Sequence, residues 1–191
     1  MSQAILHTAR LELRPLGPEH RDFIFQLDSN PEVMKHIGYG KPLDANDSAI
    51  VLKLLMETAA GDSGLGCWAG FHDDEFVGWW ILAPAQSHDT PPQVIEGKAE
   101  IGFRIMPKFW RQGYAKEGVR EMLRHGFQDL GVREVCGDTM AVNAGSRASM
   151  AACGMKLIRT FHNTYDNPTP GIEQGEVEYR ITKDEWSMLQ N

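Results

Sequence analysis

The second half of the chain alternates segments typical of strands and helices, and this alternation constrains the fold more than any other feature. The segment 98–106 (KAEIGFRIM) is typical of a strand, and 113–130 has apolar residues at helical spacing. The alternation continues with a strand, a helix and two further strands, over 132–141, 143–153, 155–165 and 176–183. This order predicts an α/β fold, in which helices pack on a sheet of mixed strand direction.

The first half contains shorter elements of the same kinds. Its patterns predict strands over 8–16, 67–71 and 76–82, helices over 18–27 and 44–60, and a Pro-rich loop over 83–97. No repeat or linker separates the halves, and 191 residues suit one domain with a proper core. We therefore expect a single domain over residues 1–191.

The composition excludes several classes of protein. Hydrophobic residues make up 42% and charged residues 24% of the chain, which is ordinary for a globular domain and unlike a disordered one. The longest weakly polar run, 76–85, is too short to span a bilayer, and the N-terminus lacks the apolar region of a signal peptide. Three cysteines without a CxxC motif favour a reducing compartment and argue against a zinc site. We expect a cytoplasmic protein with no bound metal.

Charge is unevenly distributed along the chain. The whole chain has a net charge of −7, which makes it a poor general binder of nucleic acid. Between Arg104 and Arg124, however, six basic residues stand against two acidic ones. This basic window is either an anion-binding site or the solvated face of a helix, and charge alone leaves both interpretations open.

The loop at the end of the strand 98–106 favours the first interpretation. It leads through Arg111 and Gly113 into a helix, and Lys116 lies in the first turn of that helix. Helix N-termini have unpaired N–H groups and a partial positive charge, so they bind phosphates well, and glycine allows a ligand to approach the backbone closely. The motifs GxxxxGK[ST] and GxGxxG are absent, which argues against a nucleoside-triphosphate loop and a dinucleotide fold.

Together these segments resemble the GCN5-related N-acetyltransferase (GNAT) superfamily, and more closely its RimJ/RimL-like branch. The resemblance covers nearly the whole chain, from TARLELRPL at 8–16 to EVEYRITKDEW at 176–186. The family pattern Q/R-x-x-G-x-G/A is met at Gly113 and Ala115, and Trp110 stands where the branch commonly has Trp. The resemblance implies a mixed, mostly antiparallel sheet with a splayed strand pair and flanking helices.

The same resemblance implies a site for acetyl-CoA. Its pyrophosphate would bind to the loop and first helical turn, at Arg111, Gln112, Gly113, Tyr114, Ala115 and Lys116. Its pantetheine arm would pair with the preceding strand at about Arg104, Ile105 and Met106, where a backbone N–H near Ile105 would meet the oxyanion. Asn143 and Ser146 match family residues that contact the pantetheine, although Asn143 is equally suited to capping its helix.

Two carboxylates are candidates for the general base. Glu100 matches the base position of the histone-acetyltransferase branch, and Asp138 matches that of RimI-like enzymes. We expect Glu100 to act as the base, with Asp138 as the alternative; either residue is otherwise an ordinary strand residue. Met150 occupies the position at which RimI-like enzymes carry a Tyr general acid, so the general acid stays unassigned.

The implied reaction is direct transfer of acetyl from acetyl-CoA to a primary amine in a ternary complex. The acceptor is either a protein N-terminus or a small molecule, and no nucleic acid or membrane partner is expected. A homodimer is compatible with the sequence. The rival interpretations are a CoA-binding sensor or scaffold that has lost turnover, for which Met150 is the best argument, and an enzyme for a larger acyl group.

Overall fold

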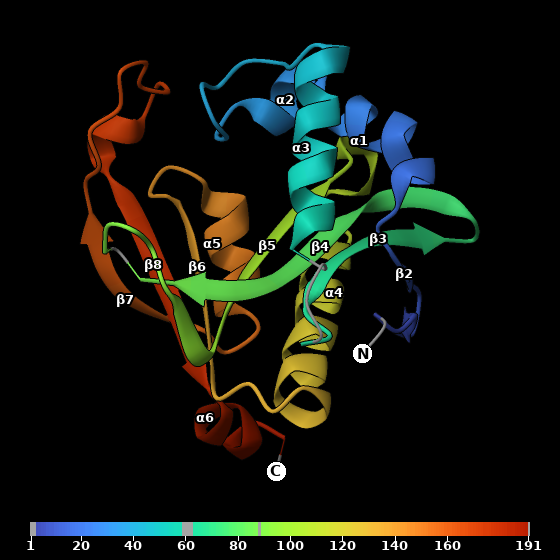
Figure 1. The fold of residues 1–191 in the computed structure, drawn as a ribbon, viewed down its shortest axis with the longest axis vertical. Coiled ribbons are helices and arrows are strands. Elements are labelled where there is room, and N and C mark those ends of the chain that lie inside the picture. Colours follow the sequence, from blue (N-terminus) through green and yellow to red (C-terminus); the bar gives the residue numbers. More distant parts are fainter. Residues whose placement is uncertain (1–2, 59–62, 88, 191) are drawn as a thin grey trace.

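An eight-stranded sheet forms the centre of the computed structural model, which describes residues 3–58, 63–87 and 89–190 (Figure 1). Within these residues the strand order is β1-β2-β3-β4-β5-β6-β8-β7. The strands are β1 Leu6–His7, β2 Glu12–Pro15, β3 Gly66–His72, β4 Glu75–Gln86, β5 Val94–Ile105, β6 Glu134–Met140, β7 Lys156–Phe161 and β8 Glu176–Thr182. All neighbouring strands are antiparallel except β5 and β6, which confirms the predicted mixed, mostly antiparallel sheet.

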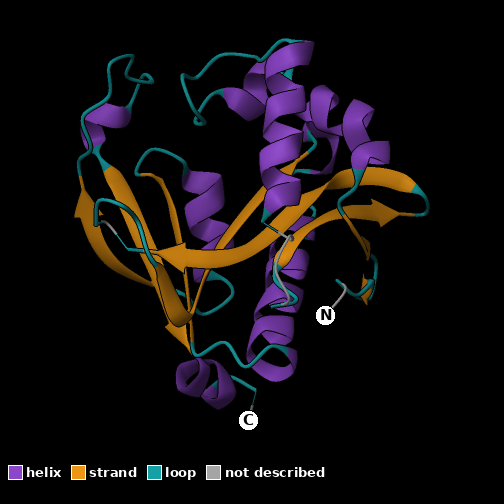
Figure 2. Ribbon diagram, in the orientation of Figure 1, coloured by secondary structure: helices purple, strands orange, loops and turns teal. Residues whose placement is uncertain are grey.

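Helices flank the sheet (Figure 2). They are α1 Arg21–Asp28, α2 Pro31–Met34, α3 Ala45–Glu57, α4 Tyr114–Arg124, α5 Ala144–Ala151 and α6 Lys183–Met188. Helices α1 and α3 contribute to one buried cluster and α4 to another, so these helices cover opposite faces of the sheet. Within the described part of the chain, none of the helices has the length and hydrophobicity needed to cross a bilayer.

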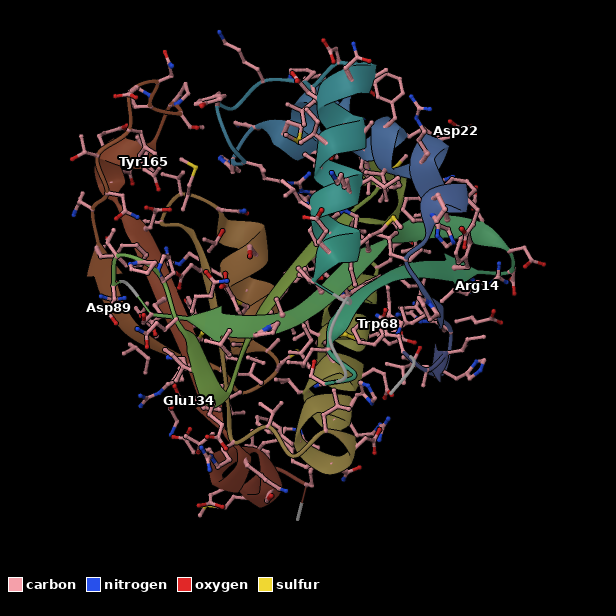
Figure 3. All side chains as sticks on the ribbon, in the orientation of Figure 1. Arg14, Asp22, Trp68, Asp89, Glu134 and Tyr165 are labelled. Atoms are coloured by element: carbon pink, nitrogen blue, oxygen red, sulfur yellow. The ribbon has the colours of Figure 1, made fainter. Side chains whose placement is uncertain are left out.

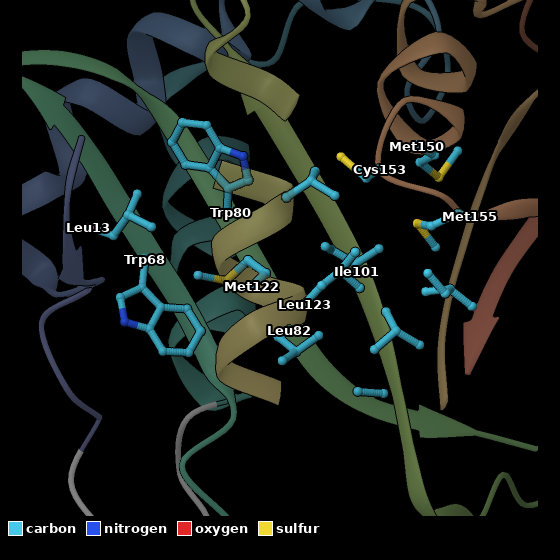
Figure 4. Packing of buried hydrophobic residues seen from close by; sticks show 14 of the residues in the cluster. Leu13, Trp68, Trp80, Leu82, Ile101, Met122, Leu123, Met150, Cys153 and Met155 are labelled. Carbon is cyan, nitrogen blue, oxygen red and sulfur yellow. The ribbon is translucent and has the colours of Figure 1, made fainter. Parts of the chain in front are cut away.

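Strand β4 is buried on both faces and fixes the position of α4. Its Trp79 packs in the cluster of α1 and α3, whereas Trp80 packs under α4 beside Met122 (Figure 4). The Trp80 indole N–H donates to the Ala115 carbonyl at 3.2 Å. A side chain at Gly118 would overlap the Trp80 ring, so this glycine allows α4 to lie close to the strand.

Strands β5 and β6 pair over three residues each and then separate. The pairing runs from Lys98 and Glu134 to Glu100 and Cys136, and beyond it the strands diverge (Figure 1). Strand β6 stays paired with β8 along its whole length, and β5 stays paired with β4 as far as Ile105. We call the gap between β5 and β6 beyond Glu100 the opening; it is the splayed strand pair that the family resemblance implies.

The structure corrects two predicted elements. Most of the predicted loop 83–97 is strand, because β4 continues to Gln86 and β5 begins at Val94. A register shift near Pro84 accommodates the proline in the ladder. The predicted helix 113–130 is α-helical only to Arg124 and then forms a π-helical turn. Of the predicted helix 44–60, the last two residues lie outside the described part of the chain.

Candidate active site

The N-terminus of α4 is open and lacks a side-chain cap. Gly113 precedes the helix with a φ of 86°, in the left-handed region that glycine adopts without strain. Among the described residues, a side chain there would meet only the Arg10 guanidinium, at 3.5 Å. Helix geometry leaves the first N–H groups of α4, at Tyr114 and the residues after it, without acceptors inside the helix. The space above these donors is therefore suited to an anion such as a pyrophosphate.

Two cations stand at this helix N-terminus. Among the described residues, the side chains of Arg111 and Lys116 make no hydrogen bond or ion pair. Arg111 also has a φ of 58°, an uncommon conformation for a residue with a Cβ, which the surrounding contacts have to hold in place. The predicted residues from Arg111 to Lys116 thus lie together around one turn whose geometry suits an anion.

Three side chains hold this turn in place; an anchoring role is predicted from the sequence for Trp110 but not for Gln112 or Arg10. The Trp110 indole N–H donates to the Ile105 carbonyl at 2.7 Å, and the Gln112 amide donates to the Lys108 carbonyl at 2.7 Å. From the N-terminal segment, Arg10 donates to the Gln112 carbonyl at 3.1 Å and forms an ion pair with Glu117 at 2.6 Å. Arg10 is 107 positions from Glu117, so no local pattern in the sequence links them.

The antiparallel ladder decides which backbone groups of β5 face the opening. The Met106 N–H donates to the Val77 carbonyl of β4 at 2.9 Å. Because backbone groups alternate in direction along an antiparallel strand, Arg104 and Met106 present theirs to β4, and Ile105 presents its N–H and carbonyl to the opening. Of the three residues predicted to contact the pantetheine, Ile105 is the one whose backbone groups face the opening. Its N–H has the direction expected of an oxyanion donor.

Helix α5 borders the opening from the side of β6. Asn143 caps this helix, since its side-chain oxygen accepts from the Ser146 N–H at 3.2 Å, which confirms the capping role. Met150 is 2% exposed, and a side chain at Gly137 would lie 3.2 Å from its sulfur. A buried thioether has no proton to give, so Met150 provides no general acid.

Carboxylates gather on the sheet face at the edge of the opening. Asp138 of β6 lies directly opposite Glu178 of β8, so both side chains occupy the same face. Loss of hydration, followed by the negative charges of Glu100 and Glu178, raises the pKa of Asp138 to about 6. Glu178 also forms an ion pair with Arg159 at 2.6 Å. The two predicted base candidates are therefore neighbours, and the pKa of Asp138, about 6, lies near neutral pH.

Two further side chains lie on this face beyond Asp138. The Tyr165 hydroxyl donates to Glu176 at 2.7 Å, and the Asn163 amide donates to the same carboxylate at 2.8 Å. Figure 3 shows Tyr165 and Glu134 near opposite ends of the β6–β8 pair. Tyr165 is thus at the end of the face toward which the opening widens.

Comparison with known proteins identifies relatives along nearly the entire chain. The family model described as "Acetyltransferase (GNAT) domain" matches residues 10–156. A protein of Aspergillus fumigatus named FsC-acetyl coenzyme A-N(2)-transacetylase is 52% identical over 189 residues, which cover 99% of this chain and 80% of that protein.

Solved structures with this architecture have low sequence identity to the chain. A spermidine N-acetyltransferase from Vibrio cholerae, in complex with CoA and spermine, has a TM-score of 0.72 at 17% identity and covers 94% of this chain and 99% of its own. RimL, a ribosomal L7/L12 alpha-N-protein acetyltransferase in complex with coenzyme A, has a TM-score of 0.75 at 16% identity, with 95% and 98% covered. At these identities the likeness shows the fold alone.

Proposed function

Because the chain belongs to the GNAT acetyltransferase family, we propose that it transfers the acetyl group of acetyl-CoA to the primary amine of a small molecule. That it is a GNAT-type N-acetyltransferase follows from the family match and from the relative at 52% identity. The structural observation that supports the proposed transfer from acetyl-CoA to an amine is the opening between β5 and β6. It begins beside Glu100 and Asp138 and lies next to an uncapped helix N-terminus that suits a pyrophosphate.

In this proposal the donor binds through backbone groups. The N–H groups of Tyr114, Ala115 and Lys116 receive the pyrophosphate, and Arg111 and Lys116 add full positive charges. The pantetheine arm enters the opening, and the thioester oxygen meets the Ile105 N–H. One such donor typically stabilises the transition state by about 3 kcal/mol. Asn143 and Ser146 flank the arm from α5.

We assign the role of general base to Asp138. The amine loses its ammonium proton to Asp138 and attacks the thioester carbonyl; a C–N bond forms, the C–S bond breaks, and coenzyme A leaves. A carboxylate with a pKa of about 6 is mostly ionised at neutral pH and still a useful base, whereas one with an ordinary pKa is weaker. Glu100 keeps the pKa of Asp138 high through its charge. With Met150 buried, solvent protonates the thiolate.

The relative at 52% identity supports a small-molecule acceptor. Its name gives acetyl coenzyme A as the donor and N(2) of FsC as the acceptor position. The second candidate for the acceptor is a protein N-terminus, as in the RimJ/RimL-like branch. RimL itself is a structural neighbour at only 16% identity. The carboxylates Glu100, Asp138 and Glu178 favour a cationic acceptor of either kind.

Release of coenzyme A tests the proposal. The protein is incubated with acetyl-CoA and, in separate reactions, with FsC, a polyamine and a peptide with the N-terminus of ribosomal L7/L12. We expect steady thiol release with FsC that exceeds the rates with the polyamine and the peptide, and a product whose mass is increased by one acetyl group. Faster turnover of the peptide would establish the second candidate. Tight binding of acetyl-CoA without turnover of any amine would contradict the proposal and favour a sensor.

A further inference from the structure

Two loops from different parts of the sheet meet at the end toward which the opening widens (Figure 1). The first loop, residues 35–44, joins α2 to α3, and the second loop, residues 162–175, joins β7 to β8. The Thr169 hydroxyl of the second loop donates to the Gly38 carbonyl of the first, 131 positions away in the sequence. Neither loop takes part in the proposed binding of acetyl-CoA or in the proposed removal of the proton.

Thr169 is buried within an otherwise exposed segment. It is 5% exposed, whereas residues 162–168 and Pro170 are exposed. A buried hydroxyl without a partner costs free energy, and the Gly38 carbonyl is the acceptor that satisfies this one. A Cβ on Gly40 would lie 2.8 Å from the Thr169 methyl group, so the first loop also packs closely on this side chain. Thr169 thus joins the two loops by a hydrogen bond and by packing.

Each loop is also anchored on its own side of the opening. In the first loop, the Leu43 N–H donates to the Asp28 carbonyl of α1 at 2.8 Å. In the second loop, a Cβ on Gly171 would lie 2.9 Å from Val142, which directly precedes the cap of α5. The contact at Thr169 therefore spans the opening, from α1 on the side of β5 to the turn before α5 on the side of β6.

Each loop presents an exposed tyrosine. Tyr39, which lies between Gly38 and Gly40, is 64% exposed, and Tyr165 is 42% exposed. Aromatic rings offer a large contact area and attract cations. An acceptor that extends out of the opening beyond its amine would meet these loops. Loops that are already held in place lose less conformational entropy when such an acceptor binds.

We propose that Thr169 is a positioning residue for the acceptor: its contact with Gly38 holds the two loops in the arrangement that binds the part of the acceptor outside the opening. This inference rests on the proposed function, since it requires the amine to reach Asp138 through the opening. It implies an amine carried on a larger molecule, with cationic or apolar groups that reach the exposed tyrosines. Loss of the contact weakens binding of the acceptor and spares acetyl-CoA, whose proposed site at Gly113 shares none of these contacts.

Steady-state kinetics of matched variants, with FsC as the acceptor, test the inference. Thr169→Val keeps the size of the side chain and removes the hydroxyl, whereas Thr169→Ser keeps the hydroxyl. Thr58→Val is the control, because the Thr58 hydroxyl also donates to a backbone carbonyl, that of Leu55, but within the C-terminal end of α3. We expect Thr169→Val to raise the KM for FsC about fivefold, with changes of less than about twofold in kcat and in the Kd for acetyl-CoA. Thr169→Ser and Thr58→Val should stay within about twofold of the wild type in all three.

A variant of the first loop tests the same contact from the other side. Gly40→Ala places a methyl group against that of Thr169 and strains a φ of 68°. We expect it to raise the KM for FsC as Thr169→Val does, again without a change in the Kd for acetyl-CoA.

Hydrogen exchange measures the contact without turnover. The Gly40 N–H donates to the Ile37 carbonyl at 2.9 Å, so its exchange reports on the order of the first loop. Amides of residues 36–43 should exchange faster in Thr169→Val than in the wild type, and at the wild-type rate in Thr58→Val. Unchanged exchange in Thr169→Val would contradict the role of this contact in holding the loops.

The contrary kinetic results separate this inference from the proposed function. An unchanged KM for FsC in Thr169→Val, an equal rise in Thr169→Ser, or an equal loss of affinity for acetyl-CoA would overturn the positioning role and leave the acetyltransferase proposal standing. Failure of the wild type to acetylate FsC would overturn the proposed acceptor and this inference together. Thermal unfolding of each variant, followed by circular dichroism, confirms that a change in KM belongs to a folded protein.

Discussion

The two sides of the opening differ in the chemical groups that they present: backbone groups on one side and side chains on the other. On the donor side, the turn before α4 and the edge of β5 offer backbone N–H groups, whose directions follow from local geometry at Gly113 and Ile105. On the proposed acceptor side, the groups are the carboxylates of Glu100, Asp138 and Glu178, which come from three different strands. A site made of backbone tolerates changes of side chain, whereas a site made of side chains changes with each substitution. We therefore expect specificity for the acceptor to be easier to alter than binding of the donor.

A buried ion pair anchors β5, the strand that borders the opening, to α1, and breaking it should have the largest effect. Arg104 extends from β5 to Asp28 of α1 at 2.6 Å, and Asp28, which is fully buried, also accepts from Ser48. Arg104→Met leaves a buried carboxylate without its partner, so we expect a loss of about 3 kcal/mol in the free energy of unfolding. Urea denaturation measures this loss. Arg159→Met, which breaks a more exposed ion pair with Glu178, should lose less than about 1 kcal/mol. Equal losses would contradict the structural role of Arg104.

Removal of the proposed base tests the acceptor side. Asp138→Asn keeps the shape of the side chain and removes its ability to take a proton, so kcat/KM near neutral pH should fall by roughly 10²-fold. The defect should shrink as the pH approaches the pKa of the amine, because free amine needs no base. Affinity for acetyl-CoA should not change. A full rate for Asp138→Asn together with an inactive Glu100→Gln would transfer the role of base to Glu100.

A side chain at the helix N-terminus tests the donor side. Gly113→Glu fills the approach to α4 with a negative group and strains a positive φ, so we expect the affinity for acetyl-CoA to fall at least tenfold, about 1.4 kcal/mol. Gly131→Glu is the matched control, since Gly131 also has a positive φ but lies after the π-helical turn, with open space around it. If both variants bind acetyl-CoA as the wild type does, the pyrophosphate site is not at Gly113.

The pH profile of Glu100→Gln tests whether the charge of Glu100 influences the pKa of Asp138. We expect the smallest of the four effects here. The charge of Glu100 is one cause of the raised pKa of Asp138. Without that charge the pKa of Asp138 falls, so the acidic limb of kcat/KM should move from about pH 6 to lower pH, with much of the activity at pH 7 retained. An acidic limb that stays in place would show that Glu100 does not influence the base.

Local patterns in the sequence predict the donor side well. The strand, turn and helix around Gly113 and the cap at Asn143 depend on neighbouring residues, and the structure contains each of them. The capping box of Thr182 and Glu185 is another local pattern that is present. Such features are fixed within a few positions of the chain, so they can be read without knowledge of the fold.

The acceptor side was less accessible to prediction because it depends on strand register. Loss of hydration, then the charge of Glu100 and then that of Glu178 raise the pKa of Asp138, and Glu178 faces Asp138 only because β6 and β8 pair in one register. The ion pair of Arg104 with Asp28 joins residues 76 positions apart. No periodicity encodes these contacts. The resemblance to a family supplied the positions of Glu100 and Asp138, but it did not indicate that the pKa of Asp138 is raised.

The short contact between β5 and β6 has a mechanical consequence. Within the described residues, three paired positions join two stiff plates, β1–β5 on one side and β6, β8 and β7 on the other. A change in the angle between the plates would strain this short joint and leave the long ladders of β4–β5 and β6–β8 intact. A larger acyl group would be accommodated first by rotation of the plates about Glu100 and Cys136, before any change in the packing within either plate.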